Sequence, residues 1–571
     1  MKKAYLYTTA ISLLTLAACE STDLNQEVKT SLTEDQVMKR YEYTMQHGIR
    51  AYNFLQPGFL NIDGAMMASA SDEAEHTLET SAIQKFNNGS WNPLDNPDPA
   101  WNNYFTGIRN VNKFLSMSDS VELDYLRLDP NAQQQALYKT YTTDLKRTKY
   151  ENRFLRAYFY FELIKRYGGV PIITEVLTLN SNLGDIQRNS LQDCITFITN
   201  ECDSAAANLP AKTIDTYLGK ITSGAAKALK SRVLLYAASD LFNNPGWAGS
   251  YANKELISVT GDRAAKWKAA ADAAKAVIDA ASAGGYSLAT NYRSLFQTYN
   301  NPEIIFVHRT GASNSFEKAT YPIGFDKANS GTTPSQNLID DYEVVVDANT
   351  AVPFDWSNPA HAANPYASRD PRFGMSVIWN NSDYKGRKVE IWAGGKDGAG
   401  VPLATKTGYY LKKYVDESLD LAQGKTSVHS WIFIRLAEIY LNYAEALNEY
   451  DPGNAAIKTY VDLVRKRSGV NMPAIPAGLS QSEMREKIRH ERRIELAFEG
   501  HREWDLRRWM LAETVLSSPL KGVKITQPSA GVFTYQPVNV ENRVFTPNMY
   551  FYPIPQSELN IQTNWIQNPL W

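Results

Sequence analysis

The stretch from Ile488 to Trp509, IRHERRIELAFEGHREWDLRRW, constrains the fold of this chain more than any other. It is too charged for an ordinary core helix and too aromatic for an ordinary surface helix. Ile494 and Phe498 lie four positions apart and therefore share one helical face. Leu506 and Trp509, three positions apart, do the same. The spacing predicts one half-buried helix within residues 480–515.

Opposite charges recur at helical spacings along this stretch. The pairs are Arg492 with Glu495, Glu499 with Arg502, Glu503 with Arg507, and Asp505 with Arg508. Such pairs contribute only roughly 0.2–0.5 kcal/mol each on an exposed helix, too little to explain their density. Arginine suits desolvated, bidentate pairing. We therefore expect these arginines to hold carboxylates and carbonyls of other segments; the alternative is a solvent-exposed ladder of ion pairs.

Two features resemble a zinc site and a disulfide, but in each the spacing between the residues is wrong for that role. His490-Glu491 begins like the zinc motif HExxH, but Ile494 stands where the second histidine is needed, so we expect no zinc site. Cys194 and Cys202 fall in one predicted helix, where their separation of eight residues corresponds to a rise of about 12 Å, beyond the reach of a disulfide. We expect core thiols rather than a catalytic cysteine.

The N-terminus has the pattern of an export signal. Two lysines precede an apolar run from Ala4 to Ala18, which is too short to span a bilayer as a helix. The run ends in Leu16-Ala-Ala-Cys19, which resembles the bacterial lipobox. That motif implies a signal peptide over residues 1–18, a lipid on Cys19 and a polar lipidated tether over residues 19–30. We expect residues 31–571 to form one domain held at a membrane surface.

The amino-acid composition limits the classes of ligand that the protein is expected to bind. The 61 acidic and 59 basic residues nearly balance, with a formal net charge of −2, so no basic field attracts nucleic acid. The 12 tryptophans and 33 tyrosines suit core packing, and they also suit stacking on sugars or peptides.

Helical periodicity dominates residues 31–285 and 430–515. Candidate helices pair as 32–52 with 100–116, 131–167 with 190–209, 222–242 with 264–283, and 433–449 with 455–468. Paired antiparallel helices with small residues at their crossings resemble tetratricopeptide repeats. An unrelated helical bundle fits the periodicity equally well.

The pattern changes over residues 286–430, which are rich in Gly, Pro, Asn and Asp. Short strand-like pieces occur at Glu303–Val307 and Met375–Trp379. Loops and strands return over residues 516–571. We therefore expect a mainly α fold, in which a tetratricopeptide-like scaffold of helical pairs carries a large region of loops and short strands.

Separated motifs along the whole mature chain resemble the SusD/RagB family of outer-membrane nutrient-binding lipoproteins. They are the lipobox at Cys19, Ser71-Asp-Glu73, Trp101 with Tyr104, Ile108 and Asn110, Arg156-Ala-Tyr-Phe159, Tyr167-Gly-Gly-Val-Pro171, Asp370-Pro-Arg372, Arg435 to Ala446, the stretch 488–509, Pro553-Ile-Pro555 and Gln567-Asn-Pro569. They occur in the order that the family has.

The resemblance implies both a fold and a role. The fold is a tetratricopeptide-like scaffold with an irregular region packed against it. The role is a surface lid on a SusC-like TonB-dependent transporter, which captures oligosaccharide and passes it into the barrel without catalysis. The alternatives are a RagB-like protein that captures peptide, a helical-repeat adaptor that binds only proteins, and a glycoside hydrolase, which requires paired carboxylates.

The family motifs do not specify the ligand, so we expect its contacts in loops outside them. Sugar recognition uses aromatic faces together with polar groups for the hydroxyls. The loop 87–99 offers such a set, with Asn61 and Asp63 in the preceding loop. The candidates are Trp91, Asn92, Asp95, Asn96, Asp63, Arg372, Trp392 and Tyr409, with Tyr321, Trp356 and Trp379 as further aromatics.

Each candidate has a structural alternative. Trp91 could be buried in a rigid, proline-rich loop, and Arg372 could clamp the fold through ion pairs. An adaptor that binds only proteins predicts that Trp91 and the other candidate aromatics are all buried. Asp95, Asn96 and Asp98 offer oxygen ligands for calcium but lack the EF-hand spacing, so we expect no cofactor.

Overall fold

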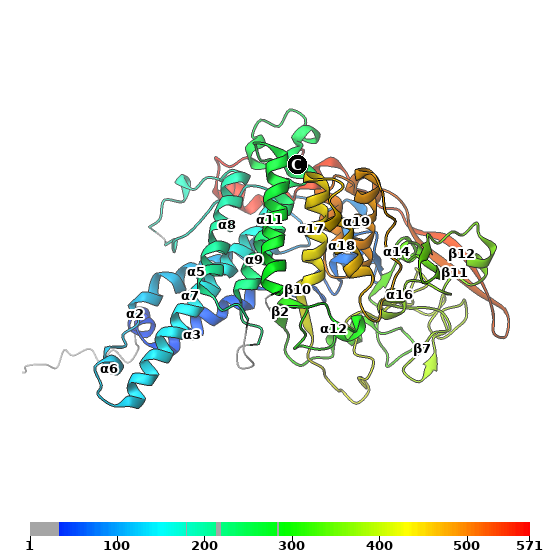
Figure 1. The fold of residues 1–571 in the computed structure, drawn as a ribbon, viewed down its shortest axis with the longest axis horizontal. Coiled ribbons are helices and arrows are strands. Elements are labelled where there is room, and N and C mark those ends of the chain that lie inside the picture. Colours follow the sequence, from blue (N-terminus) through cyan, green and yellow to red (C-terminus); the bar gives the residue numbers. More distant parts are fainter. Residues whose placement is uncertain (1–32, 179, 213–217, 283–284) are drawn as a thin grey trace, which may run out of the picture.

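The computed structural model describes residues 33–178, 180–212, 218–282 and 285–571. The lipobox, Cys19 and the tether over residues 19–30 lie outside the described residues. Helices fill one side of the molecule, and the region of short strands and loops fills the other (Figure 1).

The helices stack in one continuous array. Its members are α3 (Tyr41–Arg50), α5 (Ala100–Met117), α7 (Ala132–Tyr167), α8 (Leu191–Asn208), α9 (Ser223–Ala238), α11 (Arg263–Ser282), α17 (Leu436–Tyr450), α18 (Ala455–Arg465) and α19 (Gln481–Glu495). From α5 onward each helix packs on the next, α3 packs on both α5 and α7, and α17 also contacts α19. The four predicted pairs are confirmed, and the contact of α11 with α17 continues the array past the irregular region.

The long helix α7 shows how its sequence fixes its ends and its burial. The Asn131 side chain accepts from Gln133 N, which caps the first turn, and Gly168 with φ 70° ends the helix. The second half of α7 is buried on nearly all sides from Phe154 to Tyr167. Its first half is polar and projects from the body with α6 (Asp124–Arg127) (Figure 1).

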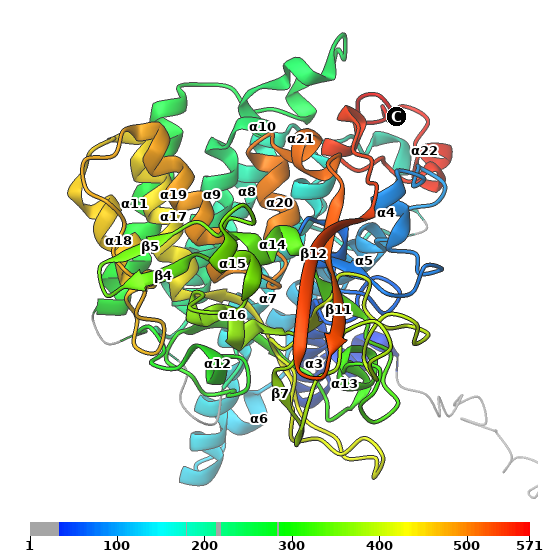
Figure 2. The same ribbon diagram turned by 90° about the vertical axis from the view of Figure 1, so that its right-hand side faces the viewer.

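Six two-stranded antiparallel sheets occur within the described residues. They pair β1 (Ala74–His76) with β3 (Thr332–Pro334), β2 (Ile304–Arg309) with β10 (Ser430–Arg435), β4 (Val344–Asp347) with β5 (Thr350–Val352), β6 (Val377–Ile378) with β9 (Tyr410–Leu411), β7 (Asp383–Tyr384) with β8 (Arg387–Lys388), and β11 (Leu520–Ser529) with β12 (Val532–Glu541). The two predicted strand pieces are confirmed by β2 and β6. Loops and strands were expected over residues 516–571, and there β11 and β12 form a long hairpin that lies across the irregular region (Figure 2).

Short helices connect these elements. They are α2 (Glu34–Met38), α4 (Gln84–Asn88), α10 (Asp240–Asn243), α12 (Tyr292–Leu295), α13 (Ser315–Thr320), α14 (Gln336–Asp341), α15 (Pro359–Ala363), α16 (Pro371–Ser376), α20 (Arg502–Arg508), α21 (Ala512–Leu516) and α22 (Gln556–Ile561).

The prediction of a single helix over the signature stretch is wrong. Helix α19 ends at Glu495 and α20 begins at Arg502. Between them the backbone turns through left-handed conformations at Phe498, with φ 63°, and at Gly500, with φ 75°. A left-handed residue cannot continue an α-helix, so the turn redirects the chain.

Candidate ligand-binding site

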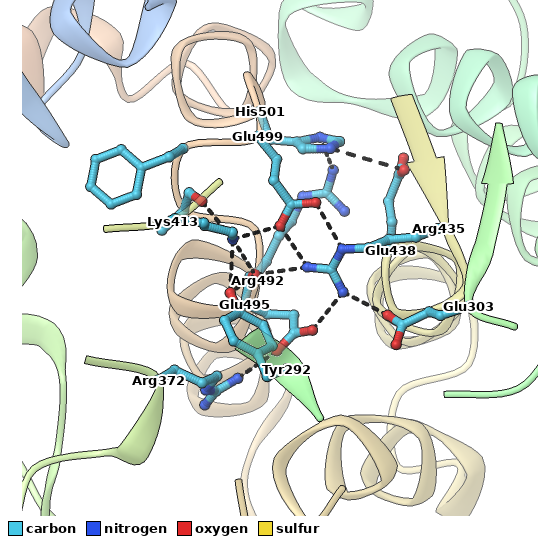
Figure 3. A network of polar contacts seen from close by, with 12 residues as sticks. Tyr292, Glu303, Arg372, Lys413, Arg435, Glu438, Arg492, Glu495, Glu499 and His501 are labelled. Carbon is cyan, nitrogen blue, oxygen red and sulfur yellow. Dashed lines mark hydrogen bonds and ion pairs between the residues drawn. The ribbon is translucent and has the colours of Figure 1, made fainter. Parts of the chain in front are cut away.

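A buried network of ion pairs joins the scaffold to the irregular region (Figure 3). At its centre Arg435, at the end of β10, donates from Nε to Glu499 Oε2 at 2.7 Å. Its Nη1 donates to Glu495 Oε1 at 2.6 Å and to Glu303 Oε1 at 2.7 Å. The guanidinium and its three carboxylates are almost fully buried. Each charge is therefore compensated where water cannot reach it.

Arg372 is part of this network, so its prediction as a ligand contact is wrong. It is fully buried and bonds Asp370, Glu491 and Glu495, with its Nη1 2.8 Å from Glu495 Oε2. The alternative, an arginine that clamps the fold, is confirmed. Arg372 fixes α16 of the irregular region to α19 of the scaffold.

Lys413 provides a second link from the irregular region. Its ammonium donates to Glu499 Oε1 at 2.8 Å and to the carbonyl of Ala497 at 2.7 Å. Tyr292 supplies a third partner at 2.8 Å. Burial lowers the pKa of Lys413 to about 8, although Glu499 opposes the shift.

The signature stretch forms only two of its four predicted local pairs. Glu503 binds Arg507 at 2.6 Å, and Asp505 binds Arg508 at 2.8 Å. The other two predicted pairs are wrong, because their members have other partners. Arg492 binds Asp505, Glu495 and Glu499 bind Arg435, and Arg502 binds Asp72. The expectation that the arginines hold carboxylates of other segments is confirmed.

The same stretch also positions the N-terminal loops. Arg502 Nε donates to Asp72 Oδ1 at 2.8 Å, and Arg493 binds the same carboxylate. Burial alone would raise the pKa of Asp72, but the two arginines hold it well below its usual range. The neighbouring Glu73 accepts from Phe498 N at 3.3 Å, and burial raises its pKa to about 8. These contacts fix the start of β1 on the scaffold.

Beyond β1 lies a group of loops that we call the loop cluster, formed by residues 61–65, 76–85 and 90–98. Asp63 Oδ2 accepts from Ala82 N at 2.8 Å, and the Ser81 hydroxyl donates to the Asp63 carbonyl at 3.0 Å. Lys85 Nζ lies 2.6 Å from Asp95 Oδ2. Residues 81–85 therefore join the loop of Asp63 to the loop of Asp95.

Two asparagines shape the cluster from within. Asn92 Oδ1 accepts from Leu94 N at 2.9 Å, and Asn96 Oδ1 accepts from Asp98 N at 3.0 Å. Each of these contacts stabilises a turn, and a backbone bridge between Asn92 and Asp95 adds to the first. Leu94 stands at the tip with 83% of its surface exposed.

Trp91 is a buried member of the loop cluster, so its prediction as a stacking face is wrong. Its exposed fraction is 2%. Its ring lies 4.9 Å from Tyr552 and 4.8 Å from Trp571 between centroids. A ring enclosed by other aromatics offers no face to a ligand, so Trp91 anchors the loop instead.

The calcium candidates do not converge. Asp95 faces Lys85, whereas Asp98 turns inward to Arg166 Nε at 2.7 Å. Among the described residues, no group of three or more His, Cys, Asp or Glu side chains is arranged to hold a metal ion.

The candidate aromatic residues of the irregular region fall into two groups, one fully buried and one half-buried. Tyr409 is fully buried with its hydroxyl bonded to Gln336 Oε1 at 2.7 Å, and Tyr321 is also fully buried, so neither is a ligand contact. Trp392 is half-buried against Phe533 at 5.2 Å. The other half-buried candidates are Trp356 and Trp379. The complete burial that an adaptor predicts is therefore not found.

Two lysines that bind carboxylates of the loop cluster were not among the predicted site residues. Lys406 lies 3.3 Å from Glu75 and also binds Glu79, which ties the irregular region to the loop cluster. Lys85 orients Asp95. Neither belongs to a motif, and Lys406 lies more than 300 positions from its partners, so only the fold brings these groups together.

A small polar cavity opens beside Asn61. Its volume is about 80 Å³, and its walls include Lys165, His501 and Trp504. The cavity has room for water molecules, which its polar walls can bind. Cys194 and Cys202 are buried free thiols, as expected.

Comparisons with known proteins agree with this architecture. Residues 302–571 match the model described as SusD family, and residues 63–235 match the model described as starch-binding associating with outer membrane. The chain is 23% identical to SusD-like protein P38 of Formosa agariphila over 534 residues, which cover 90% of this chain and 92% of that protein. It is 34% identical to SusD-like protein P2 of the same organism over 160 residues, which span 25% of this chain and 32% of that protein.

Solved structures extend the likeness to nearly the whole chain. A SusD-like protein from Bacteroides fragilis matches with a TM-score of 0.76 and 26% identity over 94% of this chain and 99% of that one. A SusD-like carbohydrate binding protein from the same organism matches with a TM-score of 0.74 and 24% identity over 92% and 99%. A laminarin binding SusD-like protein matches with a TM-score of 0.57 and 24% identity over 95% and 100%.

The fold defines a tetratricopeptide-like helical scaffold that carries a group of fixed, exposed loops. Two family models cover most of the chain, and relatives of full length share its architecture. The chain belongs to the SusD/RagB family.

Proposed function

We propose that this protein is a cell-surface lipoprotein that binds an oligosaccharide and delivers it to a SusC-like TonB-dependent transporter of the outer membrane. The loop cluster is the observation that carries this proposal. Its polar side chains come from three segments, and Arg493 and Arg502 of the signature stretch hold Asp72, just ahead of β1 and of residues 76–85 of the cluster. A site that is already ordered loses little conformational entropy when ligand binds.

The chemistry of the cluster suits sugar hydroxyls. Asp63 and Asp95 supply acceptors, and the amides of Asn92 and Asn96 supply donors as well. On the irregular region, Trp392 packs against Phe533 and keeps a half-exposed aromatic ring, which is a separate candidate for stacking on a sugar.

The relatives support a glycan over a peptide. One matched family model is described as starch-binding, one structural relative as carbohydrate binding and another as laminarin binding. The lipobox at Cys19 supports attachment to the outer membrane through lipid. Within the described part of the chain, no helix has the length and apolar character needed to cross a bilayer.

The surroundings of Asp63, Asp95 and Glu73 are consistent with a protein that binds a glycan without cleaving it. A glycosidase needs two carboxyl groups on either side of one glycosidic bond. Asp63 binds a backbone amide and Asp95 binds a lysine, while Glu73, whose pKa burial raises to about 8, is only 1% exposed. A general acid at Glu73 could not reach a substrate.

Calorimetry of the soluble mature chain against laminarin, starch, other polysaccharides and peptides tests the proposal. We expect binding to a glycan, weakened by the double variant Asp63→Ala/Asn96→Ala. The matched control is Asp272→Ala, in the exposed pair with Lys268 on α11. Binding to peptides alone would indicate a RagB-like role, and measurable turnover of a glycan would indicate a hydrolase.

A further inference from the structure

The projecting end of α7, with α6 beside it, carries exposed apolar side chains. We call this region the arm end and define it as residues 118–141. Tyr125 is 64% exposed, Leu128 is 69% exposed and Leu137 is 37% exposed. Figure 1 shows α6 at one extremity of the molecule, away from the irregular region.

The arm end is a fixed surface. Gln135 Nε2 donates to the carbonyls of Arg127 and Asp129, each at 2.7 Å, and so ties the loop after α6 to α7. Tyr41 of α3 stacks on Tyr141 of α7 with an interplanar angle of 4°. The exposed tyrosine and leucine side chains are therefore presented by an ordered backbone.

Several of the charges around these side chains are paired. Asp119 binds Lys149 at 2.6 Å, and Asp124 binds Arg127 at 2.9 Å. The surface therefore offers tyrosine hydroxyls and apolar groups beside carboxylates that neighbouring cations neutralise at Asp119 and Asp124.

The arm end also lies near the point where the described chain begins. Glu122 N donates to the carbonyl of Lys39 at 2.9 Å, and the two side chains form an ion pair at 3.1 Å. Residues 19–32 separate Cys19 from this point. A stretch of that many residues spans at most about 50 Å when fully extended, which limits how far Cys19 can lie from the arm end.

From this placement we infer that the arm end rests on the outer leaflet of the membrane that holds the lipid anchor, with Tyr125 and Leu128 in the interfacial region. The inference depends on the proposed lipidation of Cys19. Tyrosine favours the membrane interface because its ring is apolar and its hydroxyl stays in contact with water. The tether holds the arm at a high effective concentration near the surface, so a weak contact is enough to orient the molecule.

Thiol coupling provides the test without requiring lipidation in the cell. Cys194 and Cys202 are buried, so a maleimide lipid reacts selectively at Cys19 of the mature chain. The coupled protein is placed on phosphatidylcholine vesicles, and amide hydrogen exchange is followed by mass spectrometry. We expect the amides of residues 118–131 to exchange several-fold more slowly on vesicles than in the uncoupled protein.

Variants make the test specific. The double variant Tyr125→Ser/Leu128→Ser should lose this protection, while Tyr450→Ser/Leu463→Ser, which alters two exposed side chains on α17 and α18, should keep it. Absence of protection on vesicles would overturn the inference. So would equal protection after coupling to a polymer-coated bead, or protection that appears only with a co-purified outer-membrane protein. The mass of the protein from cells tests the lipid anchor separately.

Discussion

Arg492 Nε donates a hydrogen bond of 2.7 Å to Asp505 Oδ2 across the turn between α19 and α20. The other Asp505 oxygen accepts from Arg508 Nε at 2.8 Å, and Arg492 Nη1 reaches Asn442 Oδ1 at 2.7 Å. One buried pair therefore closes the turn and attaches it to α17.

Removing either member of this pair should destabilise the protein strongly. Arg492→Ala or Asp505→Ala leaves a buried charge without its partner, which costs about 3–5 kcal/mol. Urea denaturation followed by circular dichroism measures the loss. Asp279→Ala, in the exposed pair with Lys275, is the control and should leave the midpoint unchanged. Equal midpoints for all three variants would contradict a structural role for the stretch.

Trp91→Ala should lower stability by about 3–5 kcal/mol, because it removes a large side chain from a closed aromatic cluster. Trp91→Phe should cost less, since it keeps part of the packing. Thermal unfolding and glycan affinity are measured on the same samples. A Trp91→Ala variant that is stable but no longer binds glycan would show that Trp91 contacts the ligand.

Trp392→Ala should weaken glycan binding with little change in melting temperature. Stacking of an aromatic face contributes roughly 0.5–1.5 kcal/mol, which corresponds to about a two- to tenfold loss of affinity. Tyr450→Ala, an exposed aromatic on the scaffold, is the control for affinity. Unchanged affinity would remove Trp392 from the site.

Stability should fall on acidification as Glu445 is protonated. Burial alone would raise the pKa of this carboxyl, but Arg508 outweighs it and lowers the pKa to about 2. A depressed pKa gives stability that is present above the unfolded value near 4.5 and is lost as the pH falls toward 2. The contribution is roughly 3 kcal/mol.

Unfolding by urea at several pH values measures whether stability falls as the pH is lowered. Glu445→Gln should be less stable than the parent at pH 6, and its free energy of unfolding should fall less steeply between pH 4.5 and 2. Parallel curves for the two proteins would contradict the assignment.

Replacing the neighbouring carboxylates of Glu73 and Asp72 by amides should change the stability of the protein to very different extents. Glu73, with a pKa raised to about 8 by burial, is largely protonated at pH 7, so Glu73→Gln should change stability by less than about 1 kcal/mol. Asp72→Asn removes the charge that Arg493 and Arg502 share and should cost about 3–5 kcal/mol. Equal losses at pH 7 would show that both carboxyls are ionised.

The helical scaffold was predictable because its signals are local. Helices such as α8 and α11 have a buried face that repeats at helical spacing. The break at Phe498 was not predictable, since a phenylalanine in a left-handed conformation has no signal in the sequence and is stabilised by its surroundings. The ligand candidates Trp91, Tyr409 and Arg372 failed for a related reason: residue type does not reveal whether a side chain is buried.

The sequence by itself determined the helical array, the irregular region and the family, because periodicity and motifs are properties of neighbouring residues. It also determined that the arginines of the signature stretch would bind carboxylates elsewhere. Only the tertiary structure decided which carboxylates they bind, since Asp72 and Glu445 lie far from their arginines along the chain. It likewise decided that Trp91 anchors the loop cluster as a buried side chain while Asp63 and Asp95 stay at the surface, because burial depends on distant segments that close over a side chain.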